Sequence, residues 1–351
     1  METDFLIIGQ GLCGTWLSYY LQQKNCSFVV IDEENPSSAT RVASGIINPV
    51  TGRRIVKTWM IDELIPFVRH AYEAIGQTLN ISCIHQKDVI DFFPTPQMRV
   101  AFTERYQKDQ EYLSLPADEN DWRNVIRYDF GYGIIQPAYL IDLSLLLKQQ
   151  RHFLLERKQL LPVHFDISKL AIKDNVVEYE DILAKKIIFC DGAAGFENPY
   201  FKNLPYGANK GEAIWVEIND MPTTHILKKG YSLVPWKDNI FWLGSTYLWE
   251  FEDAQPTKGF YQFADNWLKQ TLQLPYTIID HKAAVRPATL ERRPFVGIHP
   301  QYSNIGILNG MGTKGCSLAP WFAKQLADSF INGAAIQPEA NVQRFSRILS
   351  R

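Results

Sequence analysis

The chain has 351 residues, of which 46% are hydrophobic and 21% charged, with 21 Gly and 19 Pro. This length and composition are typical of a globular protein with two domains, or one large domain with an insertion, and they exclude a disordered, collagen-like or coiled-coil chain. The formal net charge of -2 excludes the global positive field that drives sequence-independent nucleic-acid binding, so a nucleic-acid partner is not expected.

The five cysteines are odd in number, widely scattered and never arranged as a CxxC pair. Reduced thiols in an intracellular protein are therefore expected. No apolar run reaches the roughly 18 residues that a membrane helix needs, and the apolar stretch at residues 5–8 is too short for a signal peptide. The sequence predicts a cytoplasmic protein without a membrane span.

The N-terminal segment alternates between strand, glycine-rich turn and helix. The pattern predicts a buried strand over residues 4–8, a GxGxxG turn over residues 9–14, a helix over residues 15–24, and a second strand over residues 28–31 that ends in Asp32. This order within about 30 residues is the context that gives a GxGxxG string its meaning as a dinucleotide fingerprint.

The spacing of the glycines has a physical reason. Gly9 permits the tight turn, Gly11 allows a pyrophosphate to approach the backbone, and Gly14 allows the helix to pack closely on the strand. Asp32 follows the second strand, where a carboxylate can accept hydrogen bonds from an adenosine ribose. The alternative is a glycine-rich turn without a ligand, and the fingerprint leaves NAD and FAD both open.

The middle of the chain predicts an inserted segment and then a second sheet. Two helices are expected over residues 61–75 and 96–113, and a third over residues 141–150. Buried or alternating strands are expected over the following ranges: 169–172, 176–179, 186–190, 212–218, 231–235 and 240–245. The last three predict a mostly antiparallel sheet that forms a second domain.

The C-terminal part repeats the order of the N-terminal segment. A strand over residues 305–308 leads into the glycine-rich stretch Asn309–Gly315, and a helix is expected over residues 317–330. If both glycine junctions serve one site, the nucleotide domain is discontinuous. The predicted division gives residues 1–80, 135–205 and 285–351 to an FAD-binding domain, and residues 81–134 and 206–284 to a substrate domain.

Five stretches of the chain carry a family resemblance: Gly9–Gly14 with Asp32, residues 43–49, residues 190–193, residues 285–287 with 293–297, and residues 310–315 with 318–320. In order and spacing they resemble the D-amino-acid oxidase superfamily of FAD-dependent oxidoreductases, which includes glycine oxidases, sarcosine oxidases and the flavin domain of a tRNA-modifying enzyme. The resemblance implies an α/β (α+β) fold, with a Rossmann-type FAD-binding domain interleaved with a substrate domain on a mostly antiparallel sheet.

The resemblance also implies which residues lie around the FAD, which is expected to be noncovalent. The helix N-terminus at the second glycine junction is expected to face the flavin pyrimidine edge, where it stabilises the negative charge of the reduced flavin and Lys314 adds to it. The cofactor residues expected on this basis are Gly9, Gly11, Leu12, Cys13, Gly14, Asp32, Glu33, Thr40, Arg41, Ala43, Ser44, Gly45, Phe165, Cys190, Gly192, Gly310, Gly312, Thr313, Lys314 and Gly315.

Arg286 matches the arginine that holds the substrate carboxylate in glycine oxidase and D-amino-acid oxidase. The alternative is a structural arginine that bridges the two domains. Trp242 and Tyr247 flank a Gly-Ser-Thr stretch and are expected to wall the substrate pocket, although such aromatic residues are more often part of a sheet core. The pair Arg53-Arg54 is a further candidate for gating the site or binding an acidic substrate.

The chain also departs from the family pattern. Thr313 stands where glycine oxidase has a second arginine, and Ser232 stands where a tyrosine is expected. Trp242 occupies the place of the lysine with which sarcosine oxidases activate oxygen, and no cysteine near Arg286 matches the one that tethers their flavin.

The predicted function is FAD-dependent oxidation of a C–N bond in a small amine or amino acid, by hydride transfer to flavin N5 and without a named catalytic base. A tRNA-modifying enzyme, a flavin-binding protein without turnover and an NAD dehydrogenase are the alternatives. No histidine pair or GxSxG string indicates a metal site or a hydrolase. The sequence leaves the electron acceptor and the oligomeric state open.

Overall fold

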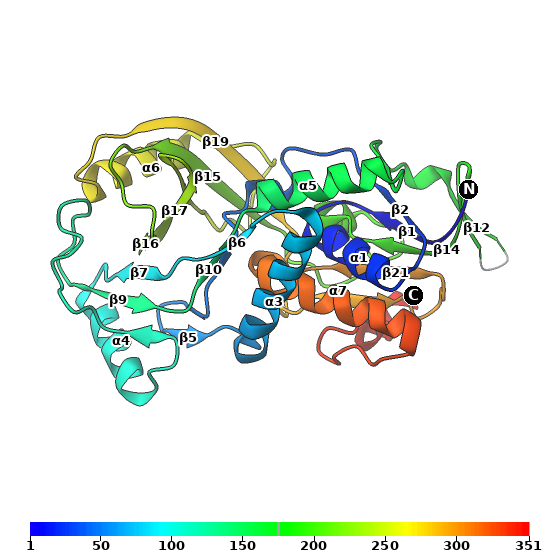
Figure 1. Ribbon diagram of the computed structural model, residues 1–351, viewed down its shortest axis with the longest axis horizontal. Helices are drawn as coiled ribbons and strands as arrows, with labels where there is room; N and C mark the ends of the chain where they lie inside the picture. The colour runs from blue at the N-terminus through cyan, green and yellow to red at the C-terminus, as the bar shows by residue number, and fades with distance from the viewer. Residues whose placement is uncertain (174–175, 351) are drawn as a thin grey trace.

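Two large sheets dominate the computed structural model, which describes residues 1–173 and 176–350 (Figure 1). Each large sheet has eight strands. A three-stranded sheet joins β3 (Ile46–Ile47), β10 (Tyr139–Ile141) and β6 (Ile84–Gln86), and β4 (Val50–Thr51) pairs with β5 (Val56–Lys57).

The first large sheet has a parallel centre. Its order is β11-β2-β1-β14-β13-β12, and β21 joins β14 while β20 joins β21. The strands are β1 (Glu2–Ile8), β2 (Phe28–Ile31), β11 (Leu160–Leu161), β12 (Leu170–Lys173), β13 (Val176–Tyr179), β14 (Ile182–Phe189), β20 (Phe295–Ile298) and β21 (Ile305–Asn309). Its five parallel strands lie in the order 3-2-1-4-5 of doubly wound dinucleotide-binding sheets.

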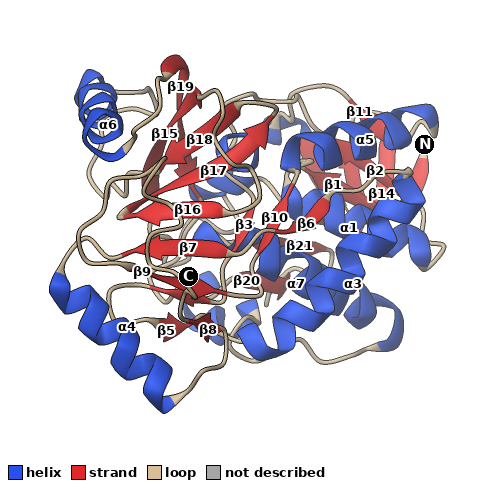
Figure 2. Ribbon diagram, turned by 60° about the vertical axis from the view of Figure 1, so that its left-hand side comes forward, coloured by secondary structure: helices blue, strands red, loops and turns tan. Residues whose placement is uncertain are grey.

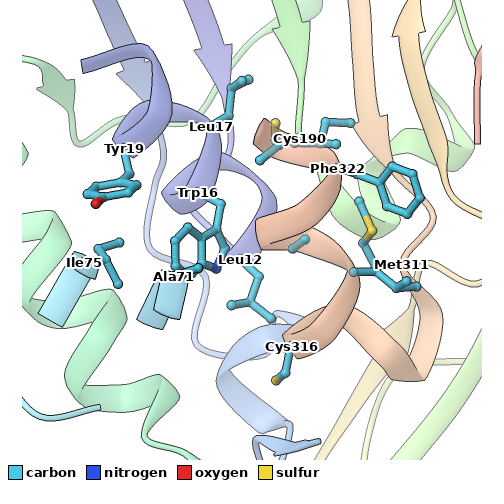
Figure 3. Close-up of a cluster of buried hydrophobic side chains, with 14 of the residues drawn as sticks. Leu12, Trp16, Leu17, Tyr19, Ala71, Ile75, Cys190, Met311, Cys316 and Phe322 are labelled. Atoms are coloured by element: carbon cyan, nitrogen blue, oxygen red, sulfur yellow. The ribbon is translucent and has the colours of Figure 1, made fainter. Parts of the chain in front are cut away.

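Four helices pack on one face of this sheet and form one buried apolar cluster with it. They are α1 (Leu12–Gln23), α3 (Ile61–Leu79), α5 (Leu143–Glu156) and α7 (Gly315–Asn332), and α7 packs against both α1 and α3. The close-up shows Trp16 of α1 beside Ala71 and Ile75 of α3 (Figure 3). A second cluster, on the other face of the sheet, includes side chains of the short C-terminal helix α8 (Ser346–Leu349).

The second large sheet is antiparallel except for one parallel pair, β7 with β16 (Figure 2). Its order is β19-β15-β18-β17-β16-β7-β9-β8. The strands are β7 (Val89–Phe92), β8 (Leu113–Ser114), β9 (Tyr132–Ile135), β15 (Asn209–Glu217), β16 (Ile226–Lys229), β17 (Tyr231–Lys237), β18 (Ile240–Gly244) and β19 (Thr277–Arg286).

The two faces of the second sheet have different neighbours. One face packs against α6 (Lys258–Thr271) in a cluster that includes Leu227 and Leu243. The opposite face forms a cluster with Val42 of the short helix α2 (Ala39–Val42) and with α4 (Pro96–Lys108), whose Phe102 is fully buried. The segment that follows β2 of the first sheet and contains α2 therefore contacts this second face.

The predicted fold class is confirmed. Several helices begin or end at other residues than the sequence predicts. The helix expected over 15–24 begins already at Leu12, the one expected over 96–113 ends at Lys108, and the one expected over 141–150 continues to Glu156. The sequence reading missed the strands β7, β9, β16, β19 and β20 and the helix α6. The strands of the first sheet come from three separated parts of the chain and those of the second from two.

Phe322 of α7 provides a test of the packing between the helices and the first sheet. Its side chain is 0% exposed and its ring stacks on Trp59 at 6.0 Å. Phe322→Ala should lower the free energy of unfolding by about 3–5 kcal/mol, because it leaves a cavity in the cluster, and urea unfolding measures this. The control Phe263→Ala removes a ring that is 45% exposed. Equal losses in the two variants would contradict the assigned core.

Candidate cofactor and substrate site

The first glycine turn allows three backbone segments to meet. Gly9 has a φ of +97°, and a Cβ there would lie 2.6 Å from the carbonyl oxygen of Cys190 at the end of β14. A Cβ on Gly14 would lie 1.8 Å from the Gly9 carbonyl oxygen. Any side chain at either position would push α1 away from the strands.

The N-terminus of α1 has the properties of an anion site. Its N-cap is Gly11, which has no side chain that could cap the helix, and its first turn holds no acidic residue. The first N–H groups of a helix lack intrahelical partners and, with the helix dipole, favour an anion. Leu12 N–H donates to Thr40 Oγ1 at 3.3 Å. If a Cβ were built on Gly11, this oxygen would be the one atom within 4 Å of it among the described residues, leaving out Gly11 and its two chain neighbours. The space beside the Gly11 backbone is therefore otherwise open.

The second glycine junction adds another helix N-terminus beside the first. Gly310 and Gly312 have φ values of +79° and +56°, and α7 also begins without a side-chain cap or an acidic residue in its first turn. A Cβ on Gly315 would lie 3.2 Å from Leu12 Cδ1. The close-up shows Leu12 beside Cys316, the second residue of α7 (Figure 3). The structure therefore brings the two junctions together.

Asp32, at the end of β2, is tied into a network that the sequence reading did not foresee. Its Oδ2 accepts from Gln10 N–H at 2.8 Å, and its Oδ1 accepts from Glu34 N–H at 2.9 Å and from the Arg151 guanidinium at 2.8 Å. Arg151 and Arg41 also form ion pairs with Glu34. Three of roughly four acceptor positions of Asp32 are thus used, which leaves one for a further donor.

The segment after β11 lies beside the end of β2. His164 Nδ1 is 3.0 Å from a Glu33 carboxylate oxygen, and the ring of Phe165 stacks on Tyr179 at 4.8 Å. The structure thus places Phe165 and Glu33 in neighbouring segments, at the side of the sheet where the adenine is expected.

The loop over residues 43–45 leads from α2 to the three-stranded sheet. Ala43 N–H donates to the Ala39 carbonyl and so ends α2. Gly45 has a φ of +87°, and a Cβ there would lie 2.1 Å from the carbonyl oxygen of Ile141. Ser44 stands between them, half-buried. Glycine at position 45 is therefore required for this close approach.

The ends of β14 and β21 are joined by side-chain hydrogen bonds. Asn309 Nδ2 donates to Asp191 Oδ1 at 2.9 Å and to the Gly192 carbonyl at 2.9 Å, and Asn198 Nδ2 donates to Asp191 Oδ2 at 3.0 Å. Burial raises the pKa of Asp191 to about 6 in spite of these donors. Cys190 is buried beside this network.

Lys314 brings a positive charge into the second junction. Its Nζ donates to Thr58 Oγ1 at 3.3 Å, and within residues 1–173 and 176–350 no carboxylate forms an ion pair with it. Burial, followed by the nearby charge of Lys228, lowers the pKa of Lys314 to about 8. The neighbouring Thr313 is exposed.

Arg286 is held at the end of β19 by neutral partners. Its guanidinium donates to Asn209 Oδ1, to Ser245 Oγ at 2.6 Å and to the Thr246 carbonyl at 3.1 Å. A Cβ on Gly211 would lie 1.9 Å from Arg286 Nη2, so glycine makes room for the guanidinium. Burial lowers the pKa of Arg286, and in the described part of the chain it has no carboxylate partner. Three hydrogen bonds leave two of its five N–H donors available.

The two predicted aromatic wall residues differ in exposure. Trp242 is 6% exposed, and its Nε1–H donates to the Val42 carbonyl at 2.9 Å, which ties the second sheet to α2. Tyr247 is 48% exposed. Arg286 Cζ lies over the Tyr247 ring, 5.3 Å from the centre of that ring. Trp242 thus belongs to the packing between the sheets, whereas Tyr247 lies directly beside Arg286.

One backbone hydrogen bond connects the regions of Arg286 and Lys314. Gly312 N–H donates to the carbonyl of Pro287, the residue after Arg286, at 3.1 Å. Arg53 and Arg54 are exposed in the turn between β4 and β5, and no described hydrogen bond or ion pair joins them to this site.

Metal and membrane features are absent from the described ranges. Across residues 1–173 and 176–350, no group of three or more His, Cys, Asp or Glu side chains has the arrangement of a metal site. In the same part of the chain, no helix is both long enough and apolar enough to cross a membrane.

A model of the FAD dependent oxidoreductase family matches residues 4–329. The chain belongs to this family. The predicted family, the enzyme class and FAD as the cofactor are thereby confirmed. The two helix N-termini, whose own N-cap residues supply no side-chain cap, and the open space beside the backbone at Gly11 fit the pyrophosphate of this dinucleotide.

Several solved structures share the fold over nearly the whole chain. Iminodiacetate oxidase from Chelativorans sp. BNC1 is 20% identical, with a TM-score of 0.75, and the match covers 95% of this chain and 96% of that one. Glycine oxidase from Geobacillus kaustophilus is 14% identical, with a TM-score of 0.74 and the same coverage. L-Proline dehydrogenase from P. horikoshii is 14% identical, with a TM-score of 0.77, and the match covers 99% and 98% of the two chains.

Gly14 tests whether the close approach at the first turn is needed for FAD. Gly14→Ala should abolish or strongly reduce FAD binding, because the added Cβ would collide with the Gly9 carbonyl oxygen at 1.8 Å. The FAD released from purified protein by denaturation, measured per chain, gives the result. In the control Gly259→Ala the Cβ meets no atom within 4 Å, so the FAD content should not change. Full FAD content in both variants would refute the assigned turn.

Proposed function

We propose that this protein oxidises the C–N bond of a small amine or amino acid, with Arg286 binding the substrate carboxylate. The observation that carries the proposal is a half-buried guanidinium without a carboxylate partner in the described ranges, with two N–H donors still available. Arginine binds carboxylates through paired, charge-assisted hydrogen bonds. Iminodiacetate, glycine and L-proline stand in the names of the three similar structures, and all are amines with a carboxylate.

Asn209 and Ser245 act as positioning residues for Arg286. Asn209 Oδ1 and Ser245 Oγ both accept from its guanidinium, and Gly211 allows that group to lie against β15. Tyr247 lies beside it and covers the bound carboxylate. FAD, when bound, would accept the hydride that leaves the carbon next to the amine nitrogen, so that the C–N single bond becomes C=N. The contribution of the chain is to bind and orient the substrate and to exclude water from it.

We assign the FAD site to the two glycine junctions and the segments beside them. The N-termini of α1 and α7, whose N-cap residues supply no side-chain cap, support the assignment, as do the close approaches at the glycines. The assigned residues are the following: Gly9, Gly11, Leu12, Cys13, Gly14, Asp32, Glu33, Thr40, Arg41, Ala43, Ser44, Gly45, Phe165, Cys190, Gly192, Gly310, Gly312, Thr313, Lys314 and Gly315.

The domain division is part of the same proposal. It gives residues 1–80, 135–205 and 285–351 to the FAD-binding domain, and the rest of the chain to the substrate domain. The three separated parts of the first sheet support it. β6 pairs across the boundary at residue 80, since its partner β10 lies in the FAD-binding part.

The FAD is proposed to be noncovalent. Burial raises the pKa of Cys13, Cys83 and Cys316 to about 12, and it also raises the pKa of Cys190. Thiols with raised pKa values stay protonated and are poor nucleophiles. All five cysteines are free, which supports the proposed location in the reducing cytoplasm. The comparisons do not favour the tRNA-modifying or the non-catalytic alternative.

The role of Arg286 is tested by Arg286→Met. The variant should keep its FAD, while kcat/KM for an amino acid that reduces the wild-type flavin should fall about a hundredfold, because two charge-assisted hydrogen bonds are lost. Anaerobic flavin reduction followed by visible absorbance measures this. Arg347→Met, at an exposed position of α8, is the matched control. Unchanged kcat/KM in Arg286→Met would overturn the assignment.

The charge of Lys314 predicts a pH dependence of anion binding. Lys314 carries its charge below a pKa of about 8 and loses it above, so the affinity for an unreactive carboxylate such as acetate should fall as the pH rises through 8. Acetate is chosen because it has no amine that titrates in this range. Perturbation of the flavin spectrum by acetate gives the dissociation constant at each pH. The fall should be absent in Lys314→Met, and an equal fall in both proteins would contradict the role of Lys314.

A further inference from the structure

Three exposed apolar side chains adjoin one another beside Arg286. Tyr247, Trp249 and Leu290 are 48%, 52% and 66% exposed. They lie in the two segments that follow β18 and β19, and β19 ends at Arg286. Single apolar side chains are common on protein surfaces, whereas adjoining ones indicate a binding site. We call these three side chains the apolar patch.

The members of the apolar patch are in close contact with one another. The rings of Tyr247 and Trp249 meet edge to face, with their centres 5.4 Å apart. A Cβ on Gly207 would lie 3.2 Å from both Trp249 Cζ3 and Leu290 Cδ2, so these two side chains lie against the same glycine. Because Arg286 lies over the Tyr247 ring, the apolar patch is continuous with the guanidinium.

One buried glutamate holds both ends of the segment 246–257, which carries two of the patch side chains. Glu212 of β15 is 0% exposed. Its backbone N–H donates to Thr246 Oγ1 at 2.8 Å, and its Oε2 accepts from Thr257 N–H at 2.6 Å. Thr257 Oγ1 also donates to Glu212 Oε1 at 3.0 Å. The segment is thus fixed to β15 at both ends.

Backbone hydrogen bonds fix the patch residues between and beyond these ends. Lys210 and Leu248 exchange two such bonds, at 2.9 and 3.0 Å. In the segment after β19, Leu290 N–H donates to the Pro205 carbonyl at 3.0 Å. A surface that is already ordered loses little conformational entropy when a ligand binds. The apolar patch is therefore preorganised for binding.

Arg286 and the apolar patch together favour a ligand with two different ends. The available N–H donors of the guanidinium suit a carboxylate. A group attached next to that carboxylate reaches Tyr247, whose ring centre is 5.3 Å from Arg286 Cζ. An apolar group is stabilised when it leaves water for such a surface, whereas a polar group loses its hydrogen bonds to water there.

We infer that the substrate is an amino acid with a large apolar side chain, which packs on the apolar patch while the carboxylate binds Arg286. Tyr247, Trp249 and Leu290 then determine specificity. Glu212 is a positioning residue that holds the segment 246–257 in place. The inference rests on the proposed function, because it names the substrate class of the same site.

The first test compares substrates of similar size and shape that differ in the polarity of the side chain. Leucine is compared with asparagine, and methionine with glutamine, in both enantiomers. The holoenzyme should oxidise leucine or methionine with a kcat/KM at least about tenfold above that of the polar counterpart, as burial of the apolar side chain predicts. Equal values in both pairs, or higher values for the amides, would overturn the inference and leave C–N oxidation in place.

The apolar patch is tested by Leu290→Gln and Trp249→Gln. Both side chains are more than half exposed, so the substitutions leave the buried clusters intact. Leu115→Gln is the matched control, because Leu115 is 45% exposed and follows β8, at the opposite end of the second sheet from β19. The preference for leucine over asparagine should fall in the two patch variants and persist in the control. An unchanged preference in both patch variants would refute their role.

A second copy of this chain is the other occupant that an exposed apolar surface can have, and sedimentation of the holoenzyme tests it. The oligomeric state should be the same in the wild type and in Trp249→Gln. A wild-type dimer that dissociates in Trp249→Gln would assign the apolar patch to a subunit interface and overturn the inference.

Calorimetry separates this inference from the proposed function, because it needs no turnover. The ligands are 4-methylpentanoate and succinamate, which have the carbon skeletons of leucine and asparagine without the amine. The holoenzyme should bind 4-methylpentanoate about tenfold more tightly, and the difference should shrink in Trp249→Gln. This result without oxidation of any amino acid would support the apolar patch and reject C–N oxidation. Equal affinities, or no binding of either ligand, would reject the apolar patch.

Discussion

The close approach of α1 to the first sheet is the constraint on which the site depends. Gly14 lies so near Gly9 that a single Cβ would reach 1.8 Å from a carbonyl oxygen, and Gly315 brings α7 against Leu12 in a similar way. Because these glycines lack side chains, two helix N-termini, neither capped by the side chain of its own N-cap residue, lie next to each other. Their first N–H groups, which lack partners within the helix, and their dipoles favour a dinucleotide pyrophosphate and the negative charge of a reduced flavin.

The second sheet is fixed to this arrangement by a few specific hydrogen bonds. Trp242 donates to the Val42 carbonyl, and Gly312 donates to the Pro287 carbonyl. The second of these bonds lies next to Arg286, so the segment that carries the guanidinium is joined to the junction that begins α7. The proposed substrate site is therefore made of groups from both sheets, which explains why the chain passes between them several times.

The sequence predicts this architecture where its determinants are local. The glycine spacing, the apolar runs and the acidic end of β2 lie within a few residues of each other, and they indicate the first sheet and both junctions. Pairings between distant segments are not visible in this way. Arg151 reaches Asp32 from α5, and Lys228 meets Asp91 only because β16 and β7 pair in parallel. β16 and β19 were missed because Lys228, Lys229 and the polar residues at 280–282 weaken the alternation that marks a strand.

The central claim is that one FAD, bound at the two glycine junctions, serves the two-electron oxidation of an amino acid's C–N single bond to C=N. A single-turnover experiment under anaerobic conditions tests it most directly, with the flavin absorbance and the carbonyl product measured in the same sample. The account predicts that an amino acid bleaches the bound flavin fully and yields one equivalent of 2-oxo acid or aldehyde per FAD. A flavin that dithionite reduces, but that no amine or amino acid reduces, would contradict it.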